Sequence, residues 1–193
     1  MLQLISVHIP KTAGSSFSIL LRRIYGARLV LDYGGEVTGL DSAEVVHGHF
    51  SASKYLEQFP DAKVIIWLRH PVERVISYYF YWLRAKRHGN PHHDYFLDNN
   101  LSLLEFANFP PLRKEVASYI GGFNPERFFF VGIVERYEFD VQKLAALLDW
   151  PEIPSVRENV TMDKPHVSLE LRDEIARLYS EEVTLYRRFL EKA

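Results

Sequence analysis

The chain has 193 residues, of which 47% are apolar and 25% are charged, a balance typical of an ordinary soluble globular protein. This length supports one domain with a sizeable core and is short for two. The formal net charge of −2 argues against general nucleic-acid binding, and the absence of cysteine excludes disulfide bonds and thiolate chemistry.

Neither a membrane span nor an export signal is expected from the sequence. The longest apolar stretches have about the length of a strand, far below the ~20 residues that cross a bilayer. The first residues lack the charged and apolar regions of a signal peptide, and Leu2–Val7 has the pattern of a core strand. We therefore expect a cytoplasmic protein without a transmembrane segment.

The chain opens with a strand, a tight loop and a helix. The strand is expected over Leu2–Val7 and the helix over Ser15–Tyr25. The apolar face of this helix consists of residues that recur at helical spacing, namely Phe17, Leu20, Leu21 and Ile24. The loop between the two elements reads Ile9-Pro10-Lys11-Thr12-Ala13-Gly14-Ser15-Ser16-Phe17.

This loop has the features of an anion site. A helix N-terminus presents unpaired N–H groups and a partial positive charge, which favour a bound phosphate. Lys11 adds a full positive charge, and the hydroxyl groups of Thr12, Ser15 and Ser16 add hydrogen-bond donors. We expect Lys11 and the backbone N–H groups from Thr12 through Ala13 and Gly14 to Ser16 to hold a phosphate or a group of similar shape.

One alternative to a phosphate site stays open at this point. Many α/β proteins open with a strand, a Gly/Ser loop and a helix that bind nothing. The loop also differs from that of nucleotide triphosphatases, which reads G-x-x-x-x-G-K-[ST]. Here Lys11 precedes Gly14, and no GK[ST] sequence occurs in the chain.

Strand and helix patterns alternate through the middle of the chain. A glycine-containing stretch over Asp32–Leu40 is followed by a strand over Glu44–Phe50 that ends in a His-Gly-His turn. A short helix is expected over Ser51–Phe59. The apolar run Lys63–Leu68 predicts a central buried strand, and a long helix is expected from Val72 to about Lys86, with Pro71 in its first turn.

The second half continues this alternation. A polar surface loop is expected over His88–Asn100. The further helices are expected over Leu101–Asn108, Leu112–Ile120, Asp140–Leu148 and from Ser168 to about Glu191, and a further strand over Arg127–Gly132. A loop containing Pro151, Pro154 and Pro165 precedes the last helix. The alternation predicts one α/β domain over 1–193, a P-loop-like three-layer sandwich whose central, mostly parallel sheet is flanked by helices.

A second anion site is predicted after the third predicted strand, Lys63–Leu68. Open α/β sheets bind ligands at the carboxyl ends of their strands, and Arg69 follows Lys63–Leu68 directly. Ser77 lies two helical turns beyond Pro71. A structural ion pair for Arg69 and a plain helix hydroxyl for Ser77 are the alternatives. Together with the first loop, the pattern fits a nucleotide with a 5′-pyrophosphate-like chain and a separate 3′-phosphate.

Several segments resemble motifs of sulfotransferases that use 3′-phosphoadenosine 5′-phosphosulfate (PAPS). Ile9–Phe17 is similar to their 5′-phosphosulfate loop, and Trp67–Tyr79 to their 3′-phosphate motif. The Arg-x-Pro-x-x-Arg-x-x-Ser-x-Tyr-Tyr spacing and the turn His47-Gly48-His49 are most like the Golgi carbohydrate enzymes, namely the uronyl and heparan 2-O-sulfotransferase group. Phe130–Glu135 resembles a later block of that family.

The chain departs from this family in two places. His70 stands where the family commonly has Asp after the 3′-phosphate arginine. The part from about Pro151 onward aligns with no family motif. The resemblance therefore implies no residue of this part as a contact for the adenine or the acceptor. The chain is also compact beside the Golgi enzymes, and we expect it to lack their membrane anchor.

The resemblance implies a reaction and roles for individual residues. PAPS would be the co-substrate and 3′,5′-ADP the product, with no metal and a hydroxyl-bearing acceptor, which we expect to be a saccharide. Lys11 would stabilise the departing 5′-phosphate oxygen, and Arg69 and Ser77 would hold the 3′-phosphate. His49 would be the general base, since histidine suits neutral pH, and His47 would assist acceptor binding or orientation.

Other interpretations of the sequence are a P-loop-type kinase that uses Mg-ATP and a nucleotide-binding module without a working base. The missing GK[ST] and the presence of Arg69 argue against the kinase. Glu135 is an alternative base or a structural partner for a cation. A metal site at His88, His92, His93 and Asp94 is not expected, and most of the aromatic run Tyr78–Trp82 is expected to lie in the core.

Overall fold

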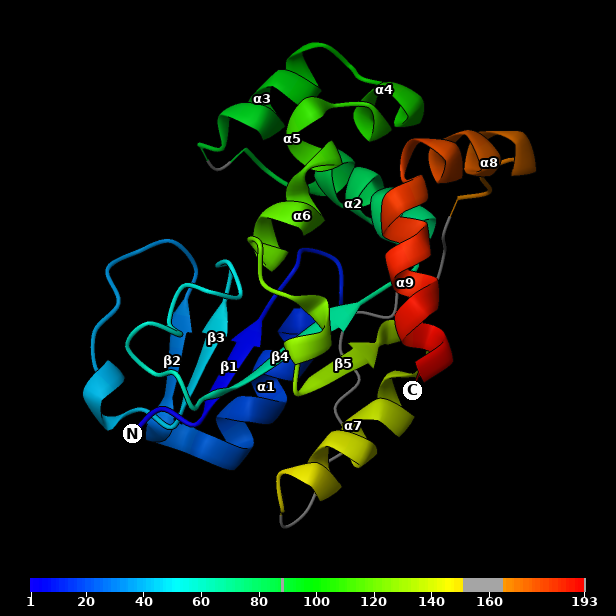
Figure 1. The fold of residues 1–193 in the computed structure, drawn as a ribbon. Coiled ribbons are helices and arrows are strands. Elements are labelled where there is room, and N and C mark those ends of the chain that lie inside the picture. Colours follow the sequence, from blue (N-terminus) through cyan, green and yellow to red (C-terminus); the bar gives the residue numbers. More distant parts are fainter. Residues whose placement is uncertain (88, 151–164, 193) are drawn as a thin grey trace. The chain divides into compact units, whose positions relative to one another are not determined.

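The computed structural model describes residues 1–87, 89–150 and 165–192, which form two compact units (Figure 1). The first unit comprises residues 1–68 and 117–150, and the second comprises residues 69–116 and 165–192. The expectation of one domain over 1–193 stays a prediction. The predicted loop prolines Pro151 and Pro154 lie outside the described residues, as does His88.

The first unit contains a parallel sheet, which confirms the predicted α/β class. Its strands are β1 (Leu4–Val7), β2 (Leu29–Asp32), β3 (Val45–Gly48), β4 (Lys63–Leu68) and β5 (Phe130–Ile133). They lie in the order β2-β3-β1-β4-β5, and every pairing between neighbours is parallel. The chain passes from β3 on one side of β1 to β4 on the other. The carboxyl end of β1 is therefore the kind of switch point at which such sheets bind ligands.

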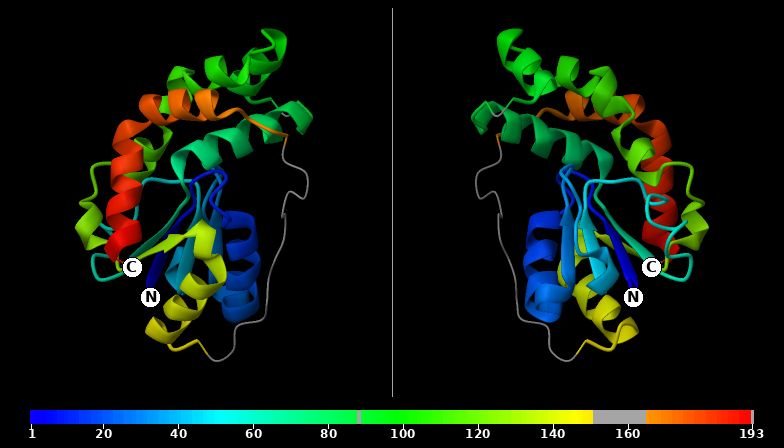
Figure 2. Two further views of the ribbon diagram at one scale, coloured as in Figure 1. Left: turned by 90° about the vertical axis from the view of Figure 1, so that its right-hand side faces the viewer. Right: turned by 90° about the vertical axis from the view of Figure 1, so that its left-hand side faces the viewer.

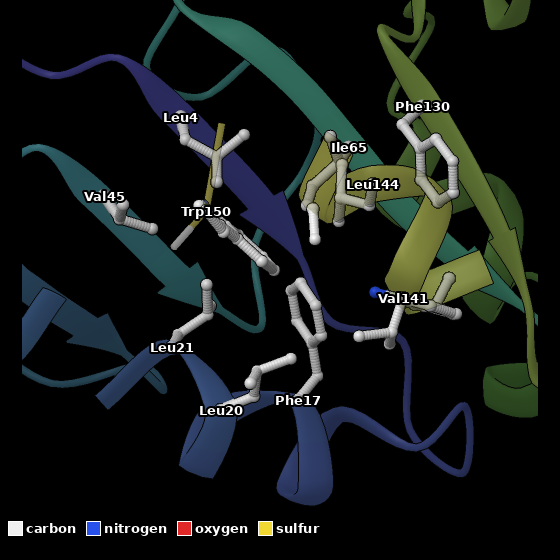
Figure 3. Close-up of a cluster of buried hydrophobic side chains, with 12 residues drawn as sticks. Leu4, Phe17, Leu20, Leu21, Val45, Ile65, Phe130, Val141, Leu144 and Trp150 are labelled. Atoms are coloured by element: carbon white, nitrogen blue, oxygen red, sulfur yellow. The ribbon is translucent and has the colours of Figure 1, made fainter. Parts of the chain in front are cut away.

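Two helices of this unit cover one face of the sheet, α1 (Gly14–Tyr25) and α7 (Tyr137–Leu147) (Figure 2). The predicted apolar face of α1 is buried: the ring of Phe17 lies 5.2 Å from that of Trp67, which comes from β4. The buried side chains of this core are drawn in Figure 3 and include Leu4, Leu20, Leu21, Val45, Ile65, Phe130, Val141 and Leu144. This packing fixes the start of α1, and with it the predicted anion loop, at the end of β1.

The second unit is helical in its described part. Its helices are α2 (Pro71–Arg84), α3 (Pro91–Asp98), α4 (Leu103–Ala107), α5 (Pro110–Arg113), α8 (Leu169–Leu178) and α9 (Ser180–Lys192). A separate apolar core joins α2, α3, α4 and α8 through residues such as Val75, Trp82, Phe96, Phe106 and Ile175. The predicted aromatic run Tyr78–Trp82 contributes Trp82 to this core, with Tyr78, Tyr79 and Phe80 packed against it.

Arg74 of the 3′-phosphate-like motif is a buried structural residue. Only 2% of its surface is exposed, and its guanidinium lies 2.6 Å from Glu115 and 3.3 Å from Glu182. Burial raises the pKa of Glu115 to about 7, although the charge of Arg74 opposes this rise. A buried cation between two carboxylates is costly to leave unpaired, so this cluster ties α2 to α9 and to the first residues of α6 (Glu115–Ile120).

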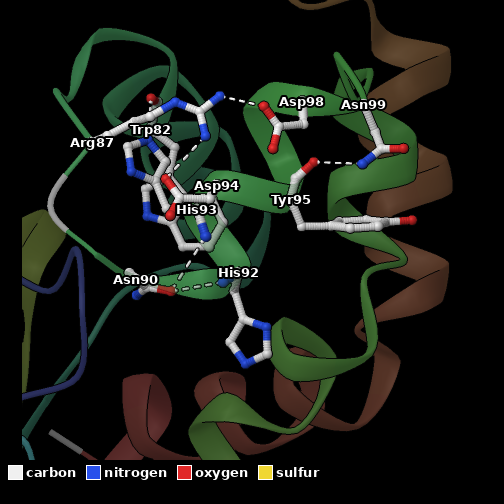
Figure 4. Close-up of polar contacts among 9 residues, drawn as sticks. All are labelled: Trp82, Arg87, Asn90, His92, His93, Asp94, Tyr95, Asp98 and Asn99. Carbon is white, nitrogen blue, oxygen red and sulfur yellow. Dashed lines mark hydrogen bonds and ion pairs between the residues drawn. The ribbon is translucent and has the colours of Figure 1, made fainter.

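The prediction of a surface loop over His88–Asn100 was wrong for most of its length. Helix α3 begins after Asn90, whose side chain accepts hydrogen bonds from the N–H groups of His92 and His93 (Figure 4). Pro91 occupies the first turn, where its fixed φ is favourable. The histidines that read as polar loop residues therefore belong to a capped helix, and the side chain of His93 is fully buried.

Four further elements differ from the predictions. Leu29–Asp32 forms a strand where none was predicted, and Ser51–Phe59 forms successive turns rather than a helix. The expected helix Leu112–Ile120 is divided between α5 and α6. The expected final helix is likewise two helices, because Tyr179 ends α8 and α9 starts at Ser180. Among the described residues, no helix combines the length and the apolar character that a bilayer crossing requires.

Candidate active site

The loop between β1 and α1 has the backbone of an anion site. Lys11 and Ala13 have positive φ values of 68° and 62°, a conformation that non-glycine residues rarely adopt. Ala13 is the N-cap residue of α1, and its own side chain makes no capping hydrogen bond. The N–H groups of the first turn have no acceptor within the helix, so they are suited to binding an anion.

The side chains of the loop have different surroundings. Thr12 is buried, and its hydroxyl donates to the carbonyl of Ile9 over 2.8 Å, so this hydroxyl stabilises the loop itself. Ser16 is buried and Ser15 is exposed, while Lys11 is half-buried. The ammonium of Lys11 lies near enough to His8 to help lower the pKa of that imidazole. The loop therefore brings one cation to the carboxyl end of β1.

Gly14 is required at the first position of α1 because of a close contact with His8. A Cβ atom added to Gly14 would lie 1.9 Å from the imidazole ring of His8. His8 follows β1 directly, so its ring fills the space between the end of the strand and the start of the helix. His8 was not among the predicted site residues.

Three histidines gather at the carboxyl ends of β1 and β3, which are neighbours in the sheet. The ring of His8 stacks on His47 at 5.2 Å and lies 4.4 Å from His49. Tyr33 packs edge-on against His49 at 4.8 Å, and its hydroxyl lies 3.1 Å from Nδ1 of His8. The predicted pair His47 and His49 is therefore part of a larger aromatic cluster, in which His49 is half-buried and Tyr33 is 44% exposed.

Burial keeps the three imidazoles neutral at physiological pH. It lowers the pKa of His8 to about 2, with His47, His49 and Lys11 contributing in the same direction. It lowers the pKa of His47 to about 3, against the opposing effect of the Gly14 and Ser6 backbones. It also lowers the pKa of His49, although the carbonyl of His8 and the charge of Asp32 act in the other direction.

The hydrogen bond of His49 fixes its tautomer. Nδ1 lies 2.6 Å from the carbonyl oxygen of His8, and because a carbonyl only accepts, Nδ1 carries the proton. Nε2 of the neutral ring therefore holds a lone pair, which is the state a general base needs. His47 differs: only 1% of its surface is exposed, and its Nδ1 lies 2.9 Å from the hydroxyl of Ser6.

Asp32 is a further residue of this region that was not among the predicted site residues. Its carboxylate accepts hydrogen bonds from Lys54 over 2.6 Å and from Tyr55 over 2.7 Å. Its carbonyl accepts from the N–H of His49 over 2.8 Å. The signal was missed because β2 was not expected, so Asp32 read as the start of a loop rather than as a strand end beside His49.

Arg69 and Ser77 belong to the second unit. Arg69 follows β4 directly and is half-buried, as is Ser77 in the second turn of α2. His70 is the N-cap of α2 without a side-chain capping bond, and its ring packs edge-on against Tyr186 at 5.4 Å. The roles of Arg69 and Ser77 toward a 3′-phosphate stay predictions.

The remaining candidate groups have structural surroundings. Asp140 is the partner of Arg136, over 3.0 Å, while Glu135 is exposed in a 3₁₀ turn (Val134–Arg136). Nε2 of His93 donates to the carbonyl of Trp82 over 2.9 Å, and Asp94 pairs with Arg87 (Figure 4). Within the described part of the chain, no three His, Cys, Asp or Glu side chains are grouped so as to hold a metal ion.

Comparisons with known proteins bear on the fold. No family model and no curated protein matches the chain. Among solved structures, the chain is similar to a sulfotransferase from Alicyclobacillus acidocaldarius, with a TM-score of 0.56 and 18% identity over 95% of this chain and 93% of that one. It also matches mouse sulfotransferase SULT7A1 complexed with PAP, with a TM-score of 0.48 and 15% identity over 91% of this chain and 62% of that one. At these identities the first likeness establishes the P-loop-like α/β fold and no more.

Proposed function

We propose that the chain is a PAPS-dependent sulfotransferase that transfers a sulfuryl group to a hydroxyl, with His49 as the general base. The observation that carries this proposal is the state of His49. Its Nδ1–H is held by the carbonyl of His8, so the lone pair of Nε2 is available in a neutral ring. The N–H groups that open α1 lie in the same unit, after the neighbouring strand β1.

In the proposed reaction, a bond forms between the acceptor oxygen and sulfur while the bond between sulfur and the 5′-phosphate oxygen breaks. The electron pair of the broken bond stays on the phosphate oxygen, where negative charge increases. Lys11 and the N–H groups at the start of α1 would stabilise that charge, as electrostatic stabilisation of a leaving group requires. The acceptor proton would pass to Nε2 of His49.

The burial of His47 favours a positioning role for this residue over direct contact with the acceptor. Its ring stacks on His8, whose carbonyl orients His49. Arg69 and Ser77 would hold the 3′-phosphate, as their place in the resembling motif implies. We expect the acceptor to be a saccharide, as in the Golgi carbohydrate group that the motif spacing resembles, and we keep the cytoplasm as the predicted location.

The P-loop-type kinase and the non-catalytic module are the competing functions. A kinase would hold Mg-ATP and would need an acidic metal ligand beside the loop. The carboxylate found in this region, Asp32, is buried and bonded to Lys54 and Tyr55, which does not favour that role. A non-catalytic module would bind the nucleotide but would need no neutral histidine with an oriented lone pair.

The test of the proposed function is transfer of labelled sulfate from PAPS to a panel of glycans by the wild type and by His49→Gln. We expect transfer by the wild type and its loss in the variant, while both bind 3′,5′-ADP equally. Binding of 3′,5′-ADP without transfer to any hydroxyl acceptor would favour the non-catalytic module. Full turnover by His49→Gln would exclude His49 as the base.

A further inference from the structure

The buried carboxylate of Asp32 is held by more partners than a surface ion pair requires. The exposed fraction of Asp32 is 1%, whereas that of the Lys54 side chain is 45%. The carboxylate accepts from the ammonium of Lys54, from the hydroxyl of Tyr55 and from the N–H of Gly34 over 3.2 Å. Although burial raises its pKa, these hydrogen bonds lower the pKa of Asp32 below its ordinary value, so it is ionised at neutral pH.

Asp32 is also joined to His49 through the backbone. The strands β2 and β3 pair in register at Asp32 and Gly48, and a Cβ atom at Gly48 would lie 1.7 Å from the carbonyl oxygen of Asp32. The same carbonyl accepts the N–H of His49. The close approach that only glycine permits at position 48 therefore holds the backbone of His49 beside a fixed negative charge.

We propose that Asp32 is a positioning residue for the transfer reaction, which holds the backbone of His49 and stabilises the imidazolium that forms when Nε2 takes the acceptor proton. This inference rests on the proposed function. Asp32 itself takes no proton in the step: the proton moves from the acceptor hydroxyl to Nε2, and the charge of the carboxylate is unchanged. Lys54 and Tyr55 keep the carboxylate in place.

The negative charge that acts on the His49 imidazole comes from Asp32, and the other groups near this ring are neutral or positive. The rings packed on His49 are those of His8, Tyr33 and Tyr119, and the charge of Asp32 acts to raise the pKa of His49 against its burial. His8 and His47 are neutral imidazoles whose own pKa values are strongly lowered. Lys54, paired with Asp32, opposes part of that effect by its positive charge.

The test is the titration of the His49 imidazole, followed by NMR in the full chain labelled at histidine. In Asp32→Asn, which keeps the size of the side chain and one of its two accepting oxygens, the midpoint is expected to fall by about 0.5 pH unit or more because the anion is lost. Lys54→Met removes the countercharge and is expected to move the midpoint upward. Tyr55→Phe loosens the same carboxylate but keeps its charge, so it serves as the matched control and is expected to change the midpoint by less than about 0.2 unit.

The acid limb of the pH–rate profile for transfer from PAPS is expected to move in the same direction as each titration. An unchanged midpoint in Asp32→Asn, or an equal shift in Tyr55→Phe, would overturn the inference. If Asp32→Asn does not fold, a midpoint in Lys54→Met that stays constant or falls would overturn it as well. The titration needs no substrate, so it can be measured even if the protein is not a sulfotransferase. If the His49 midpoint falls in Asp32→Asn as expected but the wild type transfers no sulfuryl group, the proposed function is overturned instead.

Discussion

The Nδ1–H group of the His49 imidazole donates a hydrogen bond to the backbone carbonyl of His8 over 2.6 Å. This bond joins the carboxyl ends of two neighbouring parallel strands, β3 and β1, and directs the lone pair of the ring to Nε2. The ring of His8 in turn contacts Gly14 at the start of α1. The proposed base and the proposed phosphate loop are therefore connected through one residue, His8.

The first prediction concerns the base. His49→Gln is expected to lower turnover by about 10²–10⁴-fold, because the acceptor proton has no general base. His92→Gln, at an exposed histidine of α3, is the matched control and is expected to keep wild-type turnover. Transfer of labelled sulfate measures both. Equal losses in the two variants would contradict a specific role for His49.

The second prediction concerns acid stability. The folded-state pKa of His47, about 3, lies below the ordinary value of 6.5, so unfolding takes up a proton below pH 6.5. The stability from the neutral ring is present above pH 6.5 and is lost as the pH falls toward 3. The free energy of unfolding, measured with urea, is expected to fall between pH 6 and pH 5 in the wild type. In His47→Gln this fall is expected to be smaller by about 1 kcal/mol per pH unit. An identical slope in the variant and the wild type would show that His47 is not buried as a neutral ring.

The third prediction concerns the close contact at the start of α1. Gly14→Ala places a Cβ atom 1.9 Å from the His8 ring and is expected to cost about 1–3 kcal/mol of unfolding free energy, together with activity. Gly35→Ala is the matched control, since a Cβ atom there meets nothing within 4 Å. Thermal and urea unfolding test the pair. Equal stability of the two variants would contradict the close approach of His8.

The fourth prediction separates the two arginines of the 3′-phosphate-like motif. Arg74→Met leaves Glu115 and Glu182 buried without their cation and is expected to cost about 3–5 kcal/mol of unfolding free energy.

Arg69→Met is expected to weaken 3′,5′-ADP binding by roughly 10–100-fold, because one charged hydrogen bond is lost. It is expected to leave the affinity for 5′-AMP unchanged. A proportional loss for both nucleotides would contradict contact between Arg69 and the 3′-phosphate.

Sequence patterns predicted the central elements because their signals are local. The apolar run Lys63–Leu68 matches β4 to the residue, and the helical spacing from Phe17 onward predicted the buried face of α1. Helix α3 also had a readable signal, since Asn90 and Pro91 are a typical N-cap and first-turn pair. The polar residues that follow them led to the wrong prediction of a loop.

The rest of the candidate site depends on neighbours that chain order does not reveal. His8 reads as the last residue of a strand, and its role becomes visible only because β3 pairs with β1 and brings His47 and His49 beside it. Asp32 ends a short edge strand, Leu29–Asp32, whose first three residues are only half-buried. That strand has too weak a pattern to be predicted, so its carboxylate was missed.

The measurement that tests the central claim most directly is calorimetry of the wild-type chain with 3′,5′-ADP and 5′-AMP in the absence of magnesium, and with ATP in its absence and presence. A PAPS-dependent sulfotransferase is expected to bind 3′,5′-ADP without metal and at least ~10-fold more tightly than 5′-AMP, since one additional phosphate makes charged hydrogen bonds. Magnesium is expected to give ATP no advantage over 3′,5′-ADP. Tighter binding of Mg-ATP than of 3′,5′-ADP would contradict the assignment and favour a kinase.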